Sequence, residues 1–200
     1  MRNIFFTLFL SVIFTSCNQN KIADQKTDGV KSDSIPKKDS VITPQIQNRT
    51  ADQTVKDFLC WYNDNYEKVN KIEMIKNNPP TEDTTKYYAV NFAGTEQWLK
   101  LFQESGFVSD VFLTHWRNYF KECEKAFQKD HESDGPPMGF EYDFIFQSQE
   151  QTPNNSEIQQ AAFTQNSNGD KTTIVLDFPK YGSYTKILVK SADGKWLLAE

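Results

Sequence analysis

The residues of this sequence that could carry acid–base chemistry are an aspartate and a histidine that stand apart along the chain. Asp143 lies in the segment EYDFIFQ and His115 in the segment THWRNYF. A carboxylate and an imidazole that point into one pocket can take up and return a proton. Asp143, however, alternates with aromatic residues and shares its side of the segment with Glu141 and Gln147, which is the pattern of a solvated sheet face. We therefore predict no catalytic residue.

A second group of residues could bind a ligand by ring stacking. Trp61, Tyr62 and Trp116 lie in segments with helical periodicity, and together with His115 and Asp143 they form the candidate pocket of this sequence. Aromatic rings that carry a polar group can stack on a sugar or a peptide. The competing interpretation is that these rings belong to the ordinary apolar core.

Metal, cofactor and nucleic-acid chemistry find little support in the sequence. The two histidines, His115 and His131, have no second histidine or cysteine at metal-ligand spacing, and the segment HESD is typical of a solvated loop. No glycine-rich phosphate loop occurs, so we predict no metal and no cofactor. The net charge of −5 without a basic patch argues against a nucleic-acid partner.

Cys60 and Cys123 are predicted to be structural thiols. Cys123 falls within the apolar stripe of its helical segment, whereas Cys60 falls to the side of its own stripe. Their side chains need not face each other, so we do not favour a disulfide, although an oxidising compartment would permit one. Neither thiol has an evident partner base for nucleophilic chemistry.

Three helices that would position these side chains are indicated by apolar residues at three- and four-residue steps. They cover residues 50–72, 95–106 and 109–130. A proline pair at residues 79–80 predicts a loop between the first two, ending in a short extended segment at residues 87–92. The expected capping residues are Thr50 (with Gln53), Thr95 and Ser109 at the N-terminal ends and Gly106 at a C-terminal end.

Strands are expected in the last third of the chain. Residues 138–149 alternate, which predicts a strand with Phe140, Tyr142, Phe144 and Phe146 on one apolar face. Two hairpins follow, one turning at NGD (168–170) and one at ADG (192–194). Helices first and antiparallel strands afterwards predict an α+β fold, in which N-terminal helices pack on a curved antiparallel sheet of about four strands.

The first residues have the composition of a secretory signal. Arg2 precedes an apolar run, residues 4–14, that is too short to span a bilayer as a helix. The run ends in FTSC, which resembles the lipobox of bacterial lipoproteins; the resemblance implies cleavage before Cys17 and lipid attachment to its thiol. Asn18 in place of an aspartate implies the outer membrane. Because no acidic run follows Cys17, we expect the protein to face the periplasm. The competing interpretation is a secreted protein with a chance cysteine.

Residues 18–49 are rich in Lys, Asp, Gln, Ser and Pro and are predicted to be a flexible linker. Within it, DSI and DSV resemble the Asp–Ser/Thr–apolar acceptor pattern for O-glycans, as does DTT further on. Candidate O-glycosylation sites are therefore Ser34, Ser40 and Thr84, and unmodified polar residues are the alternative.

Residues 50–200, predicted to be a single domain, resemble a family of small envelope lipoproteins, the domain-of-unknown-function family 3828. The segments that carry the resemblance are FLCWYNDNY, GTEQWLKLFQESGFVSDVF, WRNYF, GPPMGFEYDFIFQSQE and GKWLLAE. The resemblance implies an NTF2-like (cystatin-like) fold, in which helices pack into the concave side of a bent sheet. It implies no catalytic residue.

Taken together, these features predict a membrane-anchored bacterial envelope lipoprotein. Its partners would be the membrane, through the N-terminal lipid, and an unidentified small ligand or protein bound without catalysis. Two alternatives stay open: a periplasmic immunity or inhibitor lipoprotein, and a hydrolase or isomerase that uses a pocket of the domain.

Overall fold

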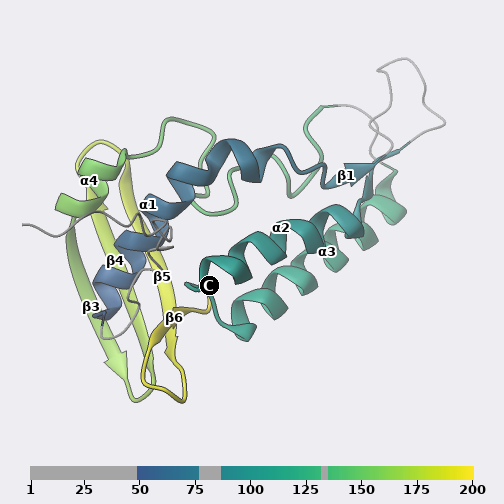
Figure 1. Cartoon of the computed structure of the whole chain (residues 1–200). Helices are drawn as coiled ribbons and strands as arrows, with labels where there is room; N and C mark the ends of the chain where they lie inside the picture. The colour runs from purple at the N-terminus through teal and green to yellow at the C-terminus, as the bar shows by residue number, and fades with distance from the viewer. Residues whose placement is uncertain (1–48, 77–86, 132–134) are drawn as a thin grey trace, which may run out of the picture. The chain divides into compact units, whose positions relative to one another are not determined.

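The computed structural model describes residues 49–76, 87–131 and 135–200, which Figure 1 shows in colour. The helices of this part are α1 (Ala51–Asn70), α2 (Phe92–Ser105), α3 (Asp110–Asp130) and α4 (Asn155–Gln160). The strands are β1 (Ile75–Lys76), β2 (Ala89–Val90), β3 (Ala162–Asn168), β4 (Lys171–Phe178), β5 (Gly182–Lys190) and β6 (Trp196–Leu198). The fold class is α+β, as the sequence predicts.

The last four strands form an antiparallel sheet in the order β3-β4-β5-β6, and β1 and β2 form a separate pair. Both hairpins predicted from NGD and ADG are present. Directly opposite residues of two paired strands project from the same face of a sheet. The even-numbered residues of β4 and β5 define the inner face, since Ile174, Leu176 and Leu188 are fully buried there.

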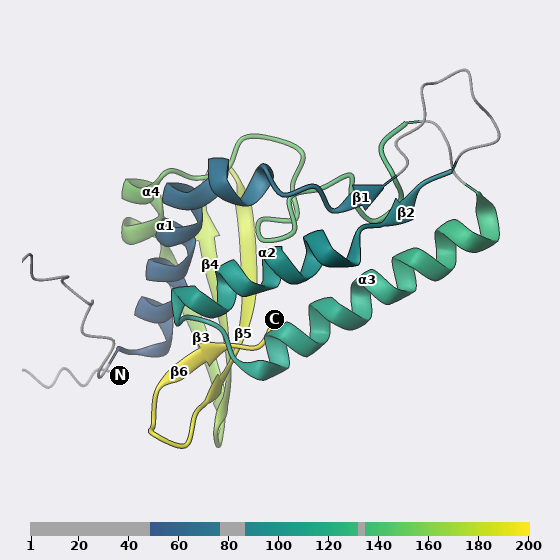
Figure 2. The same ribbon diagram turned by 45° about the vertical axis from the view of Figure 1, so that its right-hand side comes forward.

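Helix α1 covers this inner face, as the two views of Figures 1 and 2 show, and it also contacts α2 and α4. Its buried stripe includes Val55, Phe58 and Leu59, which recur at helical spacing. Helices α2 and α3 lie side by side and extend away from the sheet toward the β1–β2 pair. Closely packed rings join them, with the centroids of Trp98 in α2 and Trp116 in α3 5.6 Å apart.

Two of the predicted helix caps are confirmed and two are wrong. The Ser109 side chain accepts a hydrogen bond from the Phe112 amide, and Gly106 ends α2 in the left-handed conformation that glycine adopts without strain. Thr50 precedes α1 but makes no side-chain cap. Thr95 lies inside α2, buried, because the helix already begins at Phe92.

The strand predicted for residues 138–149 is wrong. This segment is a series of bends and turns, in which the Asp143 carboxylate accepts hydrogen bonds from the amides of Ile145 and Phe146 at 2.9 and 2.7 Å. The Gln147 amide donates to the Asp143 carbonyl, and Gln147 has a φ of 51°, which no strand tolerates. An aspartate that binds the amides two and three residues ahead favours a turn over a strand.

The predicted apolar face therefore does not exist as a unit. Tyr142 is 56% exposed, and Ile145, which was expected on the polar side, is 1% exposed. Phe146 is buried as expected, while Phe140 and Phe144 are only partly buried. The loop turns its side chains independently, so alternation in the sequence does not translate into two faces.

Helix α4 was not predicted, although its start has a capping box formed by Asn154 and Glu157. The signal peptide, residues 1–17, and the linker up to residue 48 lie outside the described residues, so these predictions stay open. None of the helices in the described ranges has the length and hydropathy required of a membrane span.

Candidate binding site around the Asp143 loop

Residues 139–150, named here the Asp143 loop, are tied to α1 by one short hydrogen bond. The hydroxyl of Tyr62 donates to Oδ2 of Asp143 at 2.5 Å, while Oδ1 accepts the two loop amides. Burial and the nearby carboxylate of Asp143 raise the pKa of Tyr62, so its hydroxyl stays protonated and acts as the donor. Asp143 therefore uses both oxygens to hold the loop against the helix.

On the α3 side, the loop encloses a hollow of about 470 Å³ that is lined by His115, Trp116 and Asp143, among others. No hydrogen bond joins His115 to Asp143 among the described residues. The indole nitrogen of Trp116 is buried without a hydrogen-bond partner in the described part of the chain. The hollow thus brings together the predicted acid–base pair but does not couple its two members.

Gly139 also lines this hollow and is held against α3. Its carbonyl accepts a hydrogen bond from the hydroxyl of Tyr119 at 2.7 Å, and its φ of 83° favours glycine. Burial and the thiol of Cys123 raise the pKa of Tyr119 to about 12, so this hydroxyl remains a donor at neutral pH. A Cβ at position 139 would lie 2.8 Å from the sulfur of Cys123, which leaves no room for a side chain.

On the α1 side, the loop borders a larger groove of about 970 Å³, named here the tyrosine groove. Two of its tyrosines are well exposed, Tyr66 at 45% and Tyr142 at 56%. The ring of Tyr66 meets that of Tyr62 edge-on, with centroids 5.9 Å apart. The groove is lined by Tyr62, Tyr66, Asn70, Met74, Trp98, Pro136, residues 140–144 and residues 148–152.

The groove therefore combines apolar rings with many polar groups that hydrogen-bond in defined directions. Amides come from Asn70, Gln149 and Gln151, and carboxylates from Glu141 and Glu150. Its volume falls within the range of about 300–1,000 Å³ that is usual for ligand pockets.

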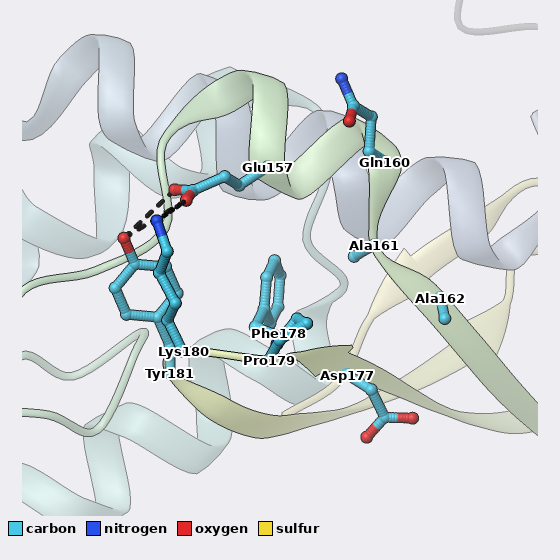
Figure 3. Close-up of a pocket in the computed structure, with 9 residues that line it drawn as sticks. All are labelled: Glu157, Gln160, Ala161, Ala162, Asp177, Phe178, Pro179, Lys180 and Tyr181. Carbon is cyan, nitrogen blue, oxygen red and sulfur yellow. Dashed lines mark hydrogen bonds and ion pairs between the residues drawn. The ribbon is translucent and has the colours of Figure 1, made fainter.

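A further hollow of about 410 Å³ lies between α4 and the turn from β4 to β5 (Figure 3). Its polar groups are paired with each other: the Glu157 carboxylate binds the Lys180 ammonium at 3.4 Å and the Tyr181 hydroxyl at 3.2 Å. Figure 3 shows this cluster at one end and the Phe178 ring in the middle. Because its charges already have partners, this hollow has less to offer a polar ligand.

Of the five residues predicted from the sequence to form a pocket, four gather at the Asp143 loop. Tyr62, His115, Trp116 and Asp143 line one or both of its hollows. Trp61 does not: its ring packs against Phe102 in the core, with centroids 5.4 Å apart. For Trp61 the core interpretation is the correct one.

The remaining predicted sites are thiols and modification sites. Cys60 and Cys123 are both free, and burial raises the pKa of each thiol, which disfavours the nucleophilic thiolate. Cys17 and the candidate O-glycosylation sites Ser34, Ser40 and Thr84 lie outside the described residues. No group of three His, Cys, Asp or Glu side chains suited to a metal ion occurs in the described ranges.

Two important residues of the tyrosine groove were missed. The apolar residues of the predicted helix 50–72 include Tyr66 at helical spacing, which indicates a buried ring, and Tyr142 was expected on the apolar face of a strand. A spacing of four residues from Tyr62 does place Tyr66 on the same side of α1, yet its ring is 45% exposed although Val69, further along that side, is buried. No sequence signal separates an exposed from a buried ring at such a position.

Comparisons with protein-family models, with curated proteins and with solved structures find no match to this chain. The resemblance to family 3828 and to the NTF2-like fold therefore stays a prediction.

Proposed function

We propose that this chain is a lipid-anchored protein of the bacterial cell envelope whose folded part binds a saccharide in the tyrosine groove, without catalysis. The observation that carries the proposal is the pair of exposed rings, Tyr66 and Tyr142, in one groove with several amide and carboxylate side chains. A sugar ring has an apolar C–H face and a rim of hydroxyl groups. The rings suit the face and the polar groups suit the rim.

We favour binding over catalysis because each candidate catalytic side chain is already hydrogen-bonded, held protonated or, within the described residues, without a carboxylate to orient it. Both oxygens of Asp143 are engaged by Tyr62 and by backbone amides, so its carboxylate has a positioning role already. A general base must reach the proton that it removes. His115 has no such carboxylate to orient it among the described residues, and the thiols of Cys60 and Cys123 are held protonated.

The lipid anchor in this proposal is supported by the sequence alone, through the apolar run that ends at Cys17. Several acyl chains together hold a protein on a membrane, since each buried CH₂ contributes about 0.8 kcal/mol. The polar residues 18–49 would separate the folded part from the bilayer. An orientation toward the periplasm would give the groove access to the saccharides of the envelope.

Isothermal titration of the purified full chain with maltohexaose, cellohexaose and chitohexaose tests the saccharide proposal. We expect saturable binding of at least one of these probes. Tyr66→Ala and Tyr142→Ala should each weaken it about three- to tenfold, since a stacked ring contributes about 0.5–1.5 kcal/mol. Tyr87→Ala is the matched control, because Tyr87 is also exposed but does not line the groove. Binding of none of the three probes, or equal losses in all three variants, would contradict the proposal.

A second candidate, an immunity or inhibitor protein, is favoured by the edge strand β3. All its residues are exposed, and the sequence AFTQNSN contains no charge and no proline, the usual protections of a strand edge. An extended segment of a partner protein could add to this edge. In co-culture, a strain that lacks this chain should then be killed by its parent strain, and a chain with Asn166→Lys should fail to protect it. Survival without the chain would exclude this role.

A further inference from the structure

Lys186 occupies an unusual position for a lysine. It lies in the middle of β5 opposite Ile174 of β4, which places its side chain on the inner face of the sheet. Ile174 is fully buried and Lys186 itself is only 7% exposed. The Asp143 loop lies over this part of the sheet, since the ring of Phe146 meets that of Tyr184 with centroids 5.4 Å apart. The lysine is therefore covered by the loop.

No hydrogen bond or ion pair holds the ammonium group of Lys186 within the described part of the chain. Two carboxylates act on it electrostatically, Asp143 from the loop and Glu200 from the segment after β6, but neither forms an ion pair with it. Burial lowers the pKa of Lys186 to about 8 against the attraction of these two groups. At neutral pH the group is thus mostly charged, and solvent or a ligand in the adjoining space must supply its acceptor.

The space next to Lys186 is a polar hollow of about 320 Å³. One wall is the loop at Gln147 and Ser148, and the other is β5 from Ser183 to Lys186. Gln147 holds its place there in a backbone conformation that non-glycine residues rarely adopt, with a φ of 51°. The hollow shares only Ser148 with the tyrosine groove, so it is a separate site.

The backbone of β5 adds hydrogen-bonding groups to this hollow. The Ile187 amide donates to the Glu200 carbonyl, and the Ile187 carbonyl accepts from Ala199, so this residue's backbone faces away from β4. The N–H and C=O groups of successive residues in a strand point alternately to one side and the other. Those of Thr185, two residues before Ile187, therefore also point away from β4. No described residue forms a hydrogen bond with them, and Thr185 lines the hollow.

We propose that this hollow binds a small organic carboxylate that carries an amide group, with Lys186 as the counter-ion of the carboxylate and the backbone of Thr185 as the partner of the amide. A carboxylate supplies the acceptor that the buried ammonium lacks, in a charge-assisted hydrogen bond. A dianion such as phosphate is disfavoured, because Asp143 and Glu200 already place negative charge near Lys186. A hollow of about 320 Å³ is at the small end of ligand sites, which limits the ligand to a few heavy groups.

The test is a calorimetric titration of the full chain at pH 7 with N-acetylglycine, which has both groups. N-acetylglycinamide and acetate are the companion probes, one without the charge and the other without the amide. Lys186→Met removes the ammonium and keeps the length of the side chain. Lys171→Met is the matched control, since Lys171 is an exposed lysine of the neighbouring strand and does not line the hollow.

We expect N-acetylglycine to bind the natural chain and the Lys171→Met variant equally. Binding to Lys186→Met should be weaker by at least about tenfold, the effect of losing one hydrogen bond to a charged group. N-acetylglycinamide should not bind, and acetate should bind more weakly than N-acetylglycine. The proposal is overturned if N-acetylglycine does not bind, if N-acetylglycinamide binds as well, or if Lys186→Met binds like the natural chain. The saccharide proposal is tested with other ligands and with the variants Tyr66→Ala and Tyr142→Ala. A failure of N-acetylglycine to bind therefore does not bear on it.

Discussion

The buried ammonium of Lys186 should lower the stability of the folded chain, and its removal should raise it. The pKa of this group falls from 10.5 to about 8 in the folded state, chiefly through burial. A decrease of this size corresponds to about 3 kcal/mol of unfavourable free energy for the charged form. This free energy is a net value that already includes the attraction of Lys186 to Asp143 and Glu200. Replacing a poorly paired buried charge by an apolar side chain of similar volume often stabilises a protein.

We therefore expect Lys186→Met to increase the free energy of unfolding at pH 7 by up to about 3 kcal/mol. Urea denaturation followed by tryptophan fluorescence measures this change. The exposed Lys171→Met control should stay within about 0.5 kcal/mol of the natural chain. A clear loss of stability in Lys186→Met would show that the ammonium has a strong partner in the folded protein, and would refute the reasoning.

The pH dependence gives the same prediction a second readout. Below pH 8 the lysine is charged in both states, and the folded state carries the full penalty. Between pH 8 and 10.5 the unfolded chain binds more protons than the folded chain, so stability rises with pH as the penalty is lost. This rise should be present in the natural chain and in Lys171→Met but absent from Lys186→Met. Parallel pH profiles of all three proteins would contradict the assignment.

Three further predictions concern the loop and the anchor. Gly139→Ala should destabilise the chain by about 1–3 kcal/mol in urea denaturation, and by more than the control Gly135→Ala, because both have positive φ but only the former crowds Cys123. An equal effect of the two would exclude crowding. Tyr62→Phe should cost about 1–3 kcal/mol by leaving an Asp143 oxygen without its donor, and an unchanged stability would contradict the role of that bond. Cys17→Ala should move the protein from the membrane to the soluble fraction of cells, and unchanged fractionation would disprove the lipid anchor.

The sequence predicts the helices and hairpins well because their signals are local. The apolar stripes of α1 and α3, the caps Ser109 and Gly106 and the two hairpin turns depend on neighbouring residues, and the structure confirms them. The start of α2 was placed too late because Thr95 is a good capping residue, and nothing local shows that the helix begins at Phe92.

The loop was misjudged for a different reason. Alternation in EYDFIFQ favours a strand, whereas the turn depends on one side chain, Asp143, and on its bond to Tyr62 from a distant helix. The sequence named Tyr62, His115, Trp116 and Asp143 as pocket residues, and these four do line the hollows beside the loop. Lys186 was missed because a lysine between apolar residues of a strand is normally read as a solvent-facing position.

The central claim, saccharide binding in the tyrosine groove, is tested most directly by nuclear magnetic resonance of the aromatic side chains during titration with the hexaose that binds best. We predict that the ring resonances of Tyr66 and Tyr142 shift together with one dissociation constant, because both rings line the groove. The resonances of Tyr87, which lies outside the groove, should stay unchanged. Shifts that spare Tyr66 and Tyr142, or that follow Tyr87 instead, would contradict the claim.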